Sequence, residues 1–562
     1  MGVPGLLNYI LEHRDCCVEY VDLIERARLQ QPSASIDLLV DFHAFANYLL
    51  GKFNASLSMA NPYASVQGGE YGLLDAWLRQ LIADLKAVGV NLIWHVDAAR
   101  SCCGKTDAQR SRLWMHRLRQ EVQRRTEVLR WCSGYASDSG VAPDPSIRPV
   151  CLEQQMLASI RASGCPVHQA VRGEADYNLA QALLTNRQAL AVLNSDSDLC
   201  VFRDSVLLPT ELFDLHGDLG LGKEPQSISQ GPLTERPLRL VVGLVSGPNV
   251  LKLLGFDRWD LLLDLSVIMG NDFTGPLLGN RDRLGNQLGV RDAVAVCKPE
   301  QSGDAGGPRL MLADFAAWLR SINGLANSRE FERRLANDQR LRSAVEHSRQ
   351  FYCLMLVEGV ESLSSSVSRC PLEAHLEAGV KEGRYASALV ALRRGRYWRR
   401  VCLEDDTPGH PSAEEGAAAQ LRDWAHRCAL RDGEPDSREE FDPGEGGHWR
   451  QMRASLRQIR GINLAPLDTR HRSIGEASAT FCALLGLPDA SRAYGWRYGA
   501  MCAALRHFLA ANCGRLLGLD LDEALSILLP ALGLHLVRPA WYASLPLRPS
   551  VRCVTVASAW LA

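Results

Sequence analysis

The chain has 562 residues, of which 46% are hydrophobic and 22% charged, and its formal net charge is −2. This length exceeds what one hydrophobic core usually holds and predicts more than one domain. The near-neutral charge excludes a polycation, so any nucleic-acid-binding surface must be local. The 17 cysteines form no C-x-x-C pair, which argues against a zinc ribbon or a thioredoxin-like redox site.

The two ends of the chain carry little sign of a membrane or secretory destination. The first residues lack a basic segment followed by an apolar one, so we expect no secretory signal. Prolines and charged residues interrupt the apolar stretch of residues 525–547, which predicts buried helix and turns and no membrane contact. We expect an intracellular protein and place it in the nucleus, although composition does not separate nucleus from cytoplasm.

Residues 1–298 predict an α/β domain with a mostly parallel central sheet flanked by helices. Short apolar runs alternate there with longer segments of helical period. Strands are expected around residues 38–40, 92–94, 166–167 and 190–193. Residues 72–88 carry the apolar stripe of a crossover helix. The Gly- and Pro-containing residues 299–308 mark the expected end of this domain.

Residues 309–562 predict a mainly helical carboxy-terminal region that is rich in Ala, Leu and Arg. A polar, acidic insertion at about 404–447 holds several Pro and Gly residues and is expected to be disordered. Arginines and aromatic residues are interleaved at 393–400, which is compatible with a nucleic-acid contact; the alternatives are a helix-end surface and a partner for the acidic insertion that follows. The sequence predicts no function for this region.

Acidic residues follow the expected strands at the points where each strand ends. Ligands of open parallel sheets bind beyond the carboxyl ends of the strands, so these side chains should meet at one edge. A further acid follows the apolar run of residues 265–269. The seven acids are Asp41, Asp97, Glu174, Asp176, Asp196, Asp198 and Asp272.

Each acid taken alone has an ordinary structural interpretation as a helix cap, a turn former or a first-turn acid. Seven carboxylates at one edge would nevertheless repel one another strongly unless cations neutralise them. Because the expected ligands are all oxygens, they favour a hard ion such as Mg²⁺ or Mn²⁺. The joint pattern therefore predicts a metal site.

The same residues resemble a known family. The opening MGVPGLL at residues 1–7 resembles the start of flap endonucleases and their XPG-like relatives, which have a PIN-like nuclease domain. The motifs Glu174-Ala175-Asp176, NSDSDLCVF at 194–202 and Gly270-Asn271-Asp272 fit the same superfamily. With GGEY at 68–71, they are similar to the signatures of its asteroid group. The resemblance covers roughly residues 1–285.

The resemblance implies a nuclease with two divalent ions, Mg²⁺ or Mn²⁺, between the acids. Two such ions clamp the attacking and leaving oxygens of an in-line displacement, which leaves a 5′-phosphate and a 3′-hydroxyl. Flap endonucleases usually have Glu at the position of Asp176, whereas the asteroid group shares Asp. In the implied arrangement, some contacts pass through water; Asp41, Asp97, Glu174 and Asp176 face one ion, and Asp196, Asp198 and Asp272 face the other.

A basic segment follows Asp97. Residues 100–130 hold nine Arg or Lys and three Asp or Glu, and from about residue 106 they predict a basic amphipathic helix. Its apolar stripe is Met115, Leu118, Val122 and Leu129. The alternative is a solvated surface helix without a ligand. The resemblance implies that this segment forms a gateway through which a single strand reaches the metal ions, and that Gly2 lies close to the site. The expected nucleic-acid-binding residues are Gly2, Lys105, Arg110, Arg112 and Arg117.

The expected substrate differs from that of flap endonucleases. Residues 279–289 lack the usual shape of the glycine-rich helix-turn-helix with which those enzymes grip duplex DNA. We therefore expect a structure-specific endonuclease that acts on single-stranded or overhang DNA, or on RNA, in DNA repair. The alternative is a nuclease-fold scaffold with weak or no activity in RNA regulation, transcription or signalling. No G-x-S-x-G elbow supports a general hydrolase, and no G-x-G-x-x-G after a strand supports a dehydrogenase.

Overall fold

The structure is a computed structural model of the whole chain. It describes residues 2–29, 35–57, 71–98, 117–128, 148, 152–170, 175–213, 239–279, 281–290, 311–354, 371–382, 390, 396–398, 437–442 and 448–453. None of the helices in these ranges combines the length and the apolar character that a membrane crossing requires.

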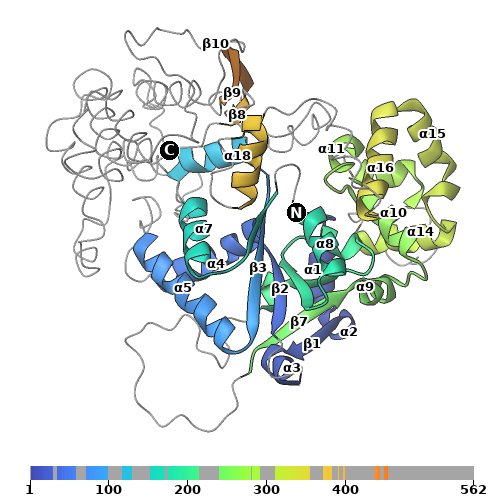
Figure 1. The fold of residues 1–562 in the computed structure, drawn as a ribbon. Helices are drawn as coiled ribbons and strands as arrows, with labels where there is room; N and C mark the ends of the chain where they lie inside the picture. Colours follow the sequence, from blue (N-terminus) through green and yellow to red (C-terminus); the bar gives the residue numbers. More distant parts are fainter. Residues whose placement is uncertain are drawn as a thin grey trace, which may run out of the picture.

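Seven strands form the central sheet, in the order β1-β7-β6-β5-β2-β3-β4 (Figure 1). Strand β2 pairs in parallel with β3 and β5, and β4 and β6 extend the parallel part on either side. Strand β7 runs antiparallel to β6 and β1. The strands are β1 Val18–Asp22, β2 Ile36–Asp41, β3 Val90–Val96, β4 Val167–Gln169, β5 Ala189–Asn194, β6 Val206–Pro209 and β7 Val241–Ser246. The prediction of a mostly parallel sheet flanked by helices is confirmed, and all four expected strands are present.

The inner strands are apolar because helices cover both faces of the sheet. In β2, Leu38 and Val40 face one layer and Leu39 faces the other, and all three are buried. The first layer also packs on Trp94, whose ring contacts Phe42 and Phe45. The helices of this layer are α3 Leu23–Leu29, α4 Phe42–Leu57, α5 Tyr71–Ala87 and α7 Leu152–Ala162. Helix α5 is the expected crossover helix of residues 72–88.

The second layer contains the amino-terminal helices and a helix that is buried on every side. Its members are α1 Leu6–Glu12, α2 Arg14–Cys17, α8 Ala175–Thr185, the 3₁₀ helix η3 Ser197–Val201, α9 Gly247–Leu254 and α10 Trp259–Met269. The apolar run of residues 265–269 is the last part of α10. Every residue from Leu261 to Met269 is buried, which explains why the run shows no amphipathic pattern.

A group of helices packs against α10 on the side away from α5 and α7 (Figure 1). These helices are α11 Gly275–Leu278, α12 Arg281–Gln287, α14 Leu312–Ile322, the 3₁₀ helix η7 Leu325–Asn327, α15 Arg329–Asn337 and α16 Gln339–Tyr352. Within the described ranges, residues 311–354 are therefore mainly helical and share one apolar core with α10. The expected boundary at 299–308 lies outside the described residues, and the division into two domains stays a prediction.

Beyond residue 354, the described residues are few. They include α18 Pro371–Lys381 and a small sheet in the order β10-β9-β8. Strand β8, Arg396–Trp398, falls in the run of arginines and aromatics, and β9, Ser437–Asp442, pairs with β10, His448–Arg453. Strand β9 falls within the expected acidic insertion, most of which lies outside the described residues.

Candidate metal centre at the carboxyl edge of the sheet

The strand order reverses at the carboxyl ends of β2 and β5. From β2 the chain adds β3 and β4 on one side, and it then returns to add β5 and β6 on the other side. Such a reversal is the point at which open α/β sheets bind their ligands. Asp41 ends β2 and Asn194 ends β5, so both residues lie at this reversal point.

Asp41 is held in place by hydrogen bonds to both of its oxygens. Its Oδ1 accepts from the backbone N–H of Ala44 at 2.8 Å, and its Oδ2 accepts from Asn194 Nδ2 at 3.3 Å. Burial raises the pKa of Asp41 to about 6, and the nearby charges of Asp97 and Asp196 add to this shift. The negative charge of Asp41 is therefore costly unless a cation lies close to it.

Asp97 follows β3 and joins it to the start of α8. Its Oδ1 accepts from the backbone N–H of Ala175 at 2.6 Å, so it caps that helix. Its Oδ2 lies 3.9 Å from Nε2 of His43, and its side chain is 37% exposed. The structure thus contains the helix-capping role that the sequence left open for this acid.

Asn194 links the acids of β2, α8 and η3. Its Nδ2 donates to Asp41 Oδ2 and to Asp176 Oδ1, both at 3.3 Å, and its Oδ1 accepts from the backbone N–H of Asp196 at 3.0 Å. The side chain is only 1% exposed. No role was predicted for this residue from the sequence. The available signal was a polar amide that ends an otherwise apolar strand.

Asp196 forms a tight turn that the amino terminus covers. It is the N-cap of η3, and its Oδ1 accepts from the backbone N–H of Asp198 at 3.0 Å. Gly2 has φ of +54°, and a Cβ atom there would lie 2.1 Å from Asp196 Oδ1. The hydroxyl of Ser197 donates to the carbonyl of Val3 at 3.1 Å. Gly2 thus lies against the acid-bearing turn.

Asp198 is almost fully buried, with 5% of its surface exposed. Its Oδ2 accepts from the hydroxyl of Tyr352 at 2.6 Å, while Oδ1 has no hydrogen-bond partner among the described residues and no contact with solvent. Burial raises the pKa of Asp198 well above its usual value, and the charges of Asp196 and Asp272 add to the shift. A buried, unpaired carboxylate oxygen is the kind of atom that a bound cation satisfies. Tyr352 is a second residue that sequence analysis missed.

Asp272 lies in a rigid turn after α10. Gly270 ends the helix with φ of +89°, and a Cβ atom there would lie 2.9 Å from the Cα of Gly275. Oδ1 of Asn271 accepts from the backbone N–H groups of Phe273 and Thr274, both at 3.1 Å. The apolar run before Asp272 is a helix, so this acid reaches the edge from the helical layer and not from a strand.

Several of the expected site residues lie outside the described residues. These are Glu174, Lys105, Arg110 and Arg112. Of the expected basic helix, residues 117–128 are described and are helical.

The inward face of that helix includes Leu118, Val128 and also Arg125. Arg125 pairs with Glu121 at 2.7 Å and donates to the carbonyl of Arg148 at 2.9 Å. At least one of the basic residues of the helix therefore has a structural role.

The carboxylates fit a hard divalent ion in their chemistry. The charges of Asp97 and Asp196 raise the pKa of Asp41, and those of Asp196 and Asp272 raise the pKa of Asp198, so these carboxylates lie near one another. The donors are all oxygens, as Mg²⁺ and Mn²⁺ prefer. Among the described residues, no three acidic, histidine or cysteine side chains are close enough to hold an ion directly. An ion here would therefore complete its coordination shell with water.

The sheet and this edge define an α/β protein with several carboxylates at its topological switch point. No protein-family model matches the chain, and no curated protein matches it in sequence. Among solved structures, it is similar to the catalytic core of Rad2 in complex with DNA substrate. One such complex has 14% identity and a TM-score of 0.30, and the match covers 63% of this chain and 85% of that chain. Another has 13% identity and a TM-score of 0.30, over 69% of this chain and 97% of that chain.

A further solved structure is the eukaryotic junction-resolving enzyme GEN-1 binding with cesium. It shares 16% identity with a TM-score of 0.25, and the match covers 70% of this chain and 72% of that chain. Likenesses this distant carry no argument about activity. The fold class is therefore assigned from the strand order of the sheet, and the candidate site is assigned from its carboxylates.

Proposed function

We propose that this protein is a divalent-metal-dependent endonuclease of the flap-endonuclease-like superfamily, in its asteroid group. It cleaves phosphodiester bonds in single-stranded or overhang DNA, in DNA repair within the nucleus. The observation that carries the proposal is the row of neighbouring carboxylates at the switch point, with Oδ1 of the buried Asp198 unpaired among the described residues.

The residues divide into two groups that would each face one ion. Asp41, Asp97 and Asp176 form one group with Glu174. Asp196, Asp198 and Asp272 form the other. Bound divalent ions would supply an activated water and would stabilise the charge that develops on the phosphate.

The chain itself supplies orientation to these groups. Nδ2 of Asn194 donates to one oxygen of Asp41 and to one oxygen of Asp176, and it thereby holds the two carboxylates next to each other. The turn hydrogen bond from the backbone of Asp198 fixes Oδ1 of Asp196. The buried ends of β2 and β5 exclude bulk water from behind the acids, which strengthens electrostatic interactions at the edge.

The nucleic-acid contacts belong to the same proposal. Lys105, Arg110, Arg112 and Arg117 lie in the basic segment after Asp97 and would neutralise backbone phosphates. Such contacts position a strand without reading its sequence, and they do not by themselves separate DNA from RNA.

A cleavage assay tests the proposal. The full-length protein is incubated with labelled single-stranded, 3′-overhang and flap DNA and with single-stranded RNA, with Mg²⁺, Mn²⁺ or EDTA. We expect metal-dependent cleavage of single-stranded and overhang DNA that Asp196→Ala abolishes without loss of the folded state by circular dichroism. If the wild type and Asp196→Ala show the same trace cleavage, the enzyme proposal fails and the scaffold alternative replaces it.

A further inference from the structure

One face of α16 contacts two parts of the candidate metal centre, namely Asp198 and the residue before Asp272. The hydroxyl of Tyr352, at the end of this helix, donates to Asp198 Oδ2 at 2.6 Å. One turn earlier, Oγ of Ser348 accepts from Nδ2 of Asn271 at 2.7 Å. Residues four apart in a helix lie on the same face. A single helix face therefore contacts both η3 and the turn that carries Asp272.

The Tyr352 contact lies in a dry, tightly packed environment. Tyr352 and Ser348 are both fully buried. The ring of Tyr352 meets those of Phe202, Phe273 and Phe351, with centroid distances of 5.0, 6.3 and 5.2 Å. A hydrogen bond to a carboxylate is stronger in such surroundings than in water. The aromatic cluster thus fixes the ring, and the ring fixes the position of the hydroxyl.

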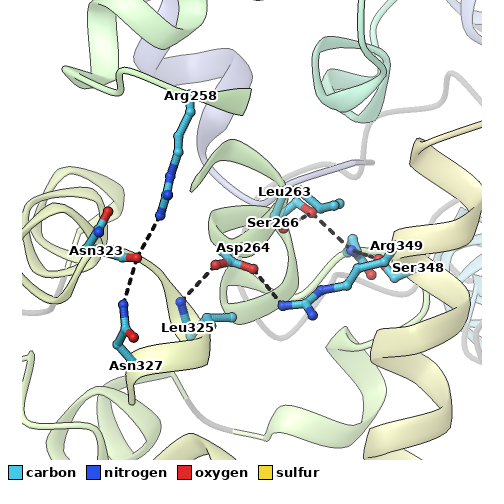
Figure 2. Close-up of polar contacts among 10 residues, drawn as sticks. Arg258, Leu263, Asp264, Ser266, Asn323, Leu325, Asn327, Ser348 and Arg349 are labelled. Atoms are coloured by element: carbon cyan, nitrogen blue, oxygen red, sulfur yellow. Dashed lines mark hydrogen bonds and ion pairs between the residues drawn. The ribbon is translucent and has the colours of Figure 1, made fainter. Parts of the chain in front are cut away.

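Helix α16 is itself tied to α10, which precedes Asp272 (Figure 2). Nη2 of Arg349 lies 2.9 Å from Oδ1 of Asp264, whose Oδ2 accepts from the backbone N–H of Leu325 at 2.8 Å. Figure 2 shows Asp264 of α10 between these two partners. The position of α16 relative to the turn that carries Asp272 is therefore set by polar contacts as well as by apolar packing.

We propose that Tyr352 and Ser348 are positioning residues of the metal centre, an inference that rests on the proposed function. Tyr352 holds Oδ2 of Asp198, so that Oδ1 is the oxygen that faces an ion. Ser348 acts through Asn271, whose side chain fixes the turn that carries Asp272. A helix that lies beyond the expected nuclease domain thereby determines the geometry of the second ion group.

The test removes one hydroxyl at a time from the full-length protein. Tyr352→Phe keeps the ring in its aromatic cluster and deletes only the hydrogen bond to Asp198. Tyr48→Phe is the matched control, because the hydroxyl of Tyr48 donates to the carbonyl of Phe213 at 2.7 Å in the other helical layer. Binding of Mn²⁺ alone is followed by the electron paramagnetic resonance signal of the free ion, and thermal unfolding shows that each variant is folded.

We expect Tyr352→Phe to weaken Mn²⁺ binding by about 10-fold, the lower end of the effect of losing a partner of a metal ligand. Tyr48→Phe should leave Mn²⁺ binding unchanged. With DNA present, Tyr352→Phe should lower kcat at limiting Mn²⁺, and added Mn²⁺ should restore it while KM for DNA stays constant. Ser348→Ala should weaken Mn²⁺ binding in the same direction, since it removes the shorter of the two hydrogen bonds from Nδ2 of Asn271 and leaves only the one to Oγ of Ser266 at 3.3 Å.

Two results would overturn the inference in different ways. If wild-type binding of Mn²⁺ depends on Asp196 but Tyr352→Phe binds as the wild type does, the positioning role fails and the proposed function stands. If the wild type and Asp196→Ala bind Mn²⁺ equally, the metal centre itself fails and the inference fails with it.

Discussion

Replacement of Gly2 by Ala perturbs the candidate centre without changing any charge. An added Cβ would lie 2.1 Å from Asp196 Oδ1 and 2.6 Å from both the backbone nitrogen of Asp198 and Oγ of Ser197. Real Cβ atoms essentially never approach closer than 3.0 Å, so something must move by about 1 Å. One of the three contacts is backbone, and Val3 is buried and bonded to Ser197, so the amino terminus cannot simply withdraw.

The expected effect follows from that displacement. A misplacement of about 1 Å in a catalytic constellation costs roughly 10²-fold in rate. We therefore expect Gly2→Ala to lower Mn²⁺-dependent cleavage of a labelled 3′-overhang DNA by about that factor. The positive φ at residue 2 adds a backbone strain of about 1–2 kcal/mol for any residue with a Cβ.

Gly5→Ala is the matched control for this backbone strain. Gly5 has φ of +87°, and a Cβ atom there would meet no heavy atom within 4 Å. It should lose stability in thermal unfolding and keep its cleavage rate. If Gly2→Ala and Gly5→Ala cleave at the same rate, the packing of residue 2 against the acid-bearing turn has no bearing on the site.

Three further predictions concern acids, their amide link and the basic segment. Burial raises the pKa of Asp41 to about 6 and that of Asp198 well above its usual value, so the metal-free fold loses stability as pH rises through about 6. Since an ion binds the charged forms, Mn²⁺ should raise Tm more above pH 6 than below it, and an equal rise at both would contradict the assignment. Asn194→Ala should weaken Mn²⁺ binding by about 10-fold in calorimetry, because it removes the amide that bridges Asp41 and Asp176. Unchanged binding would refute the positioning role of Asn194. Charge reversal of Arg110 and Arg112 should weaken binding to DNA of any sequence. It should also reduce the slope of log affinity against log salt concentration by about one unit per lost phosphate contact. An unchanged slope in a salt titration would argue against the role of the basic segment as a gateway for a single strand.

Four of the five parallel strands, β2 to β5, and the acids that follow them could be predicted from the sequence because one physical rule connects them, whereas β6 was not predicted. Both faces of β2, β3 and β5 are covered, so the strands appear as apolar runs, and the residue after each run must lie at the ligand edge. Asp41, Asp97 and Asp196 follow from this rule alone. Strand β1 could not be recognised, because it follows α2 directly and its half-exposed residues show no alternation.

The contacts that join distant segments could not be predicted. Tyr352 lies 154 residues from Asp198, and only the packing of α16 on α10 brings them together. Asp272 was expected at the edge, but the preceding run gave no sign of helix or strand, because a helix buried on all sides lacks periodicity. Asn194 carries two hydrogen bonds whose partners come from β2 and α8, and no local pattern encodes them.

The two ends of β2 offer the most direct test of the central claim, because each carries a carboxylate. Asp41 lies at the end of β2 where the metal centre is proposed, whereas Asp37 lies at the opposite end and accepts from Asn91 Nδ2 at 3.2 Å and from Asn186 Nδ2 at 3.1 Å. Cleavage of single-stranded and 3′-overhang DNA is measured for the wild type, Asp41→Asn and Asp37→Asn, with Mn²⁺ or with EDTA. We predict Mn²⁺-dependent cleavage by the wild type and Asp37→Asn, and a loss of at least about 10²-fold in Asp41→Asn. Equal cleavage by the two variants, or cleavage that persists in EDTA, would contradict the assignment of this edge as a divalent-metal nuclease site.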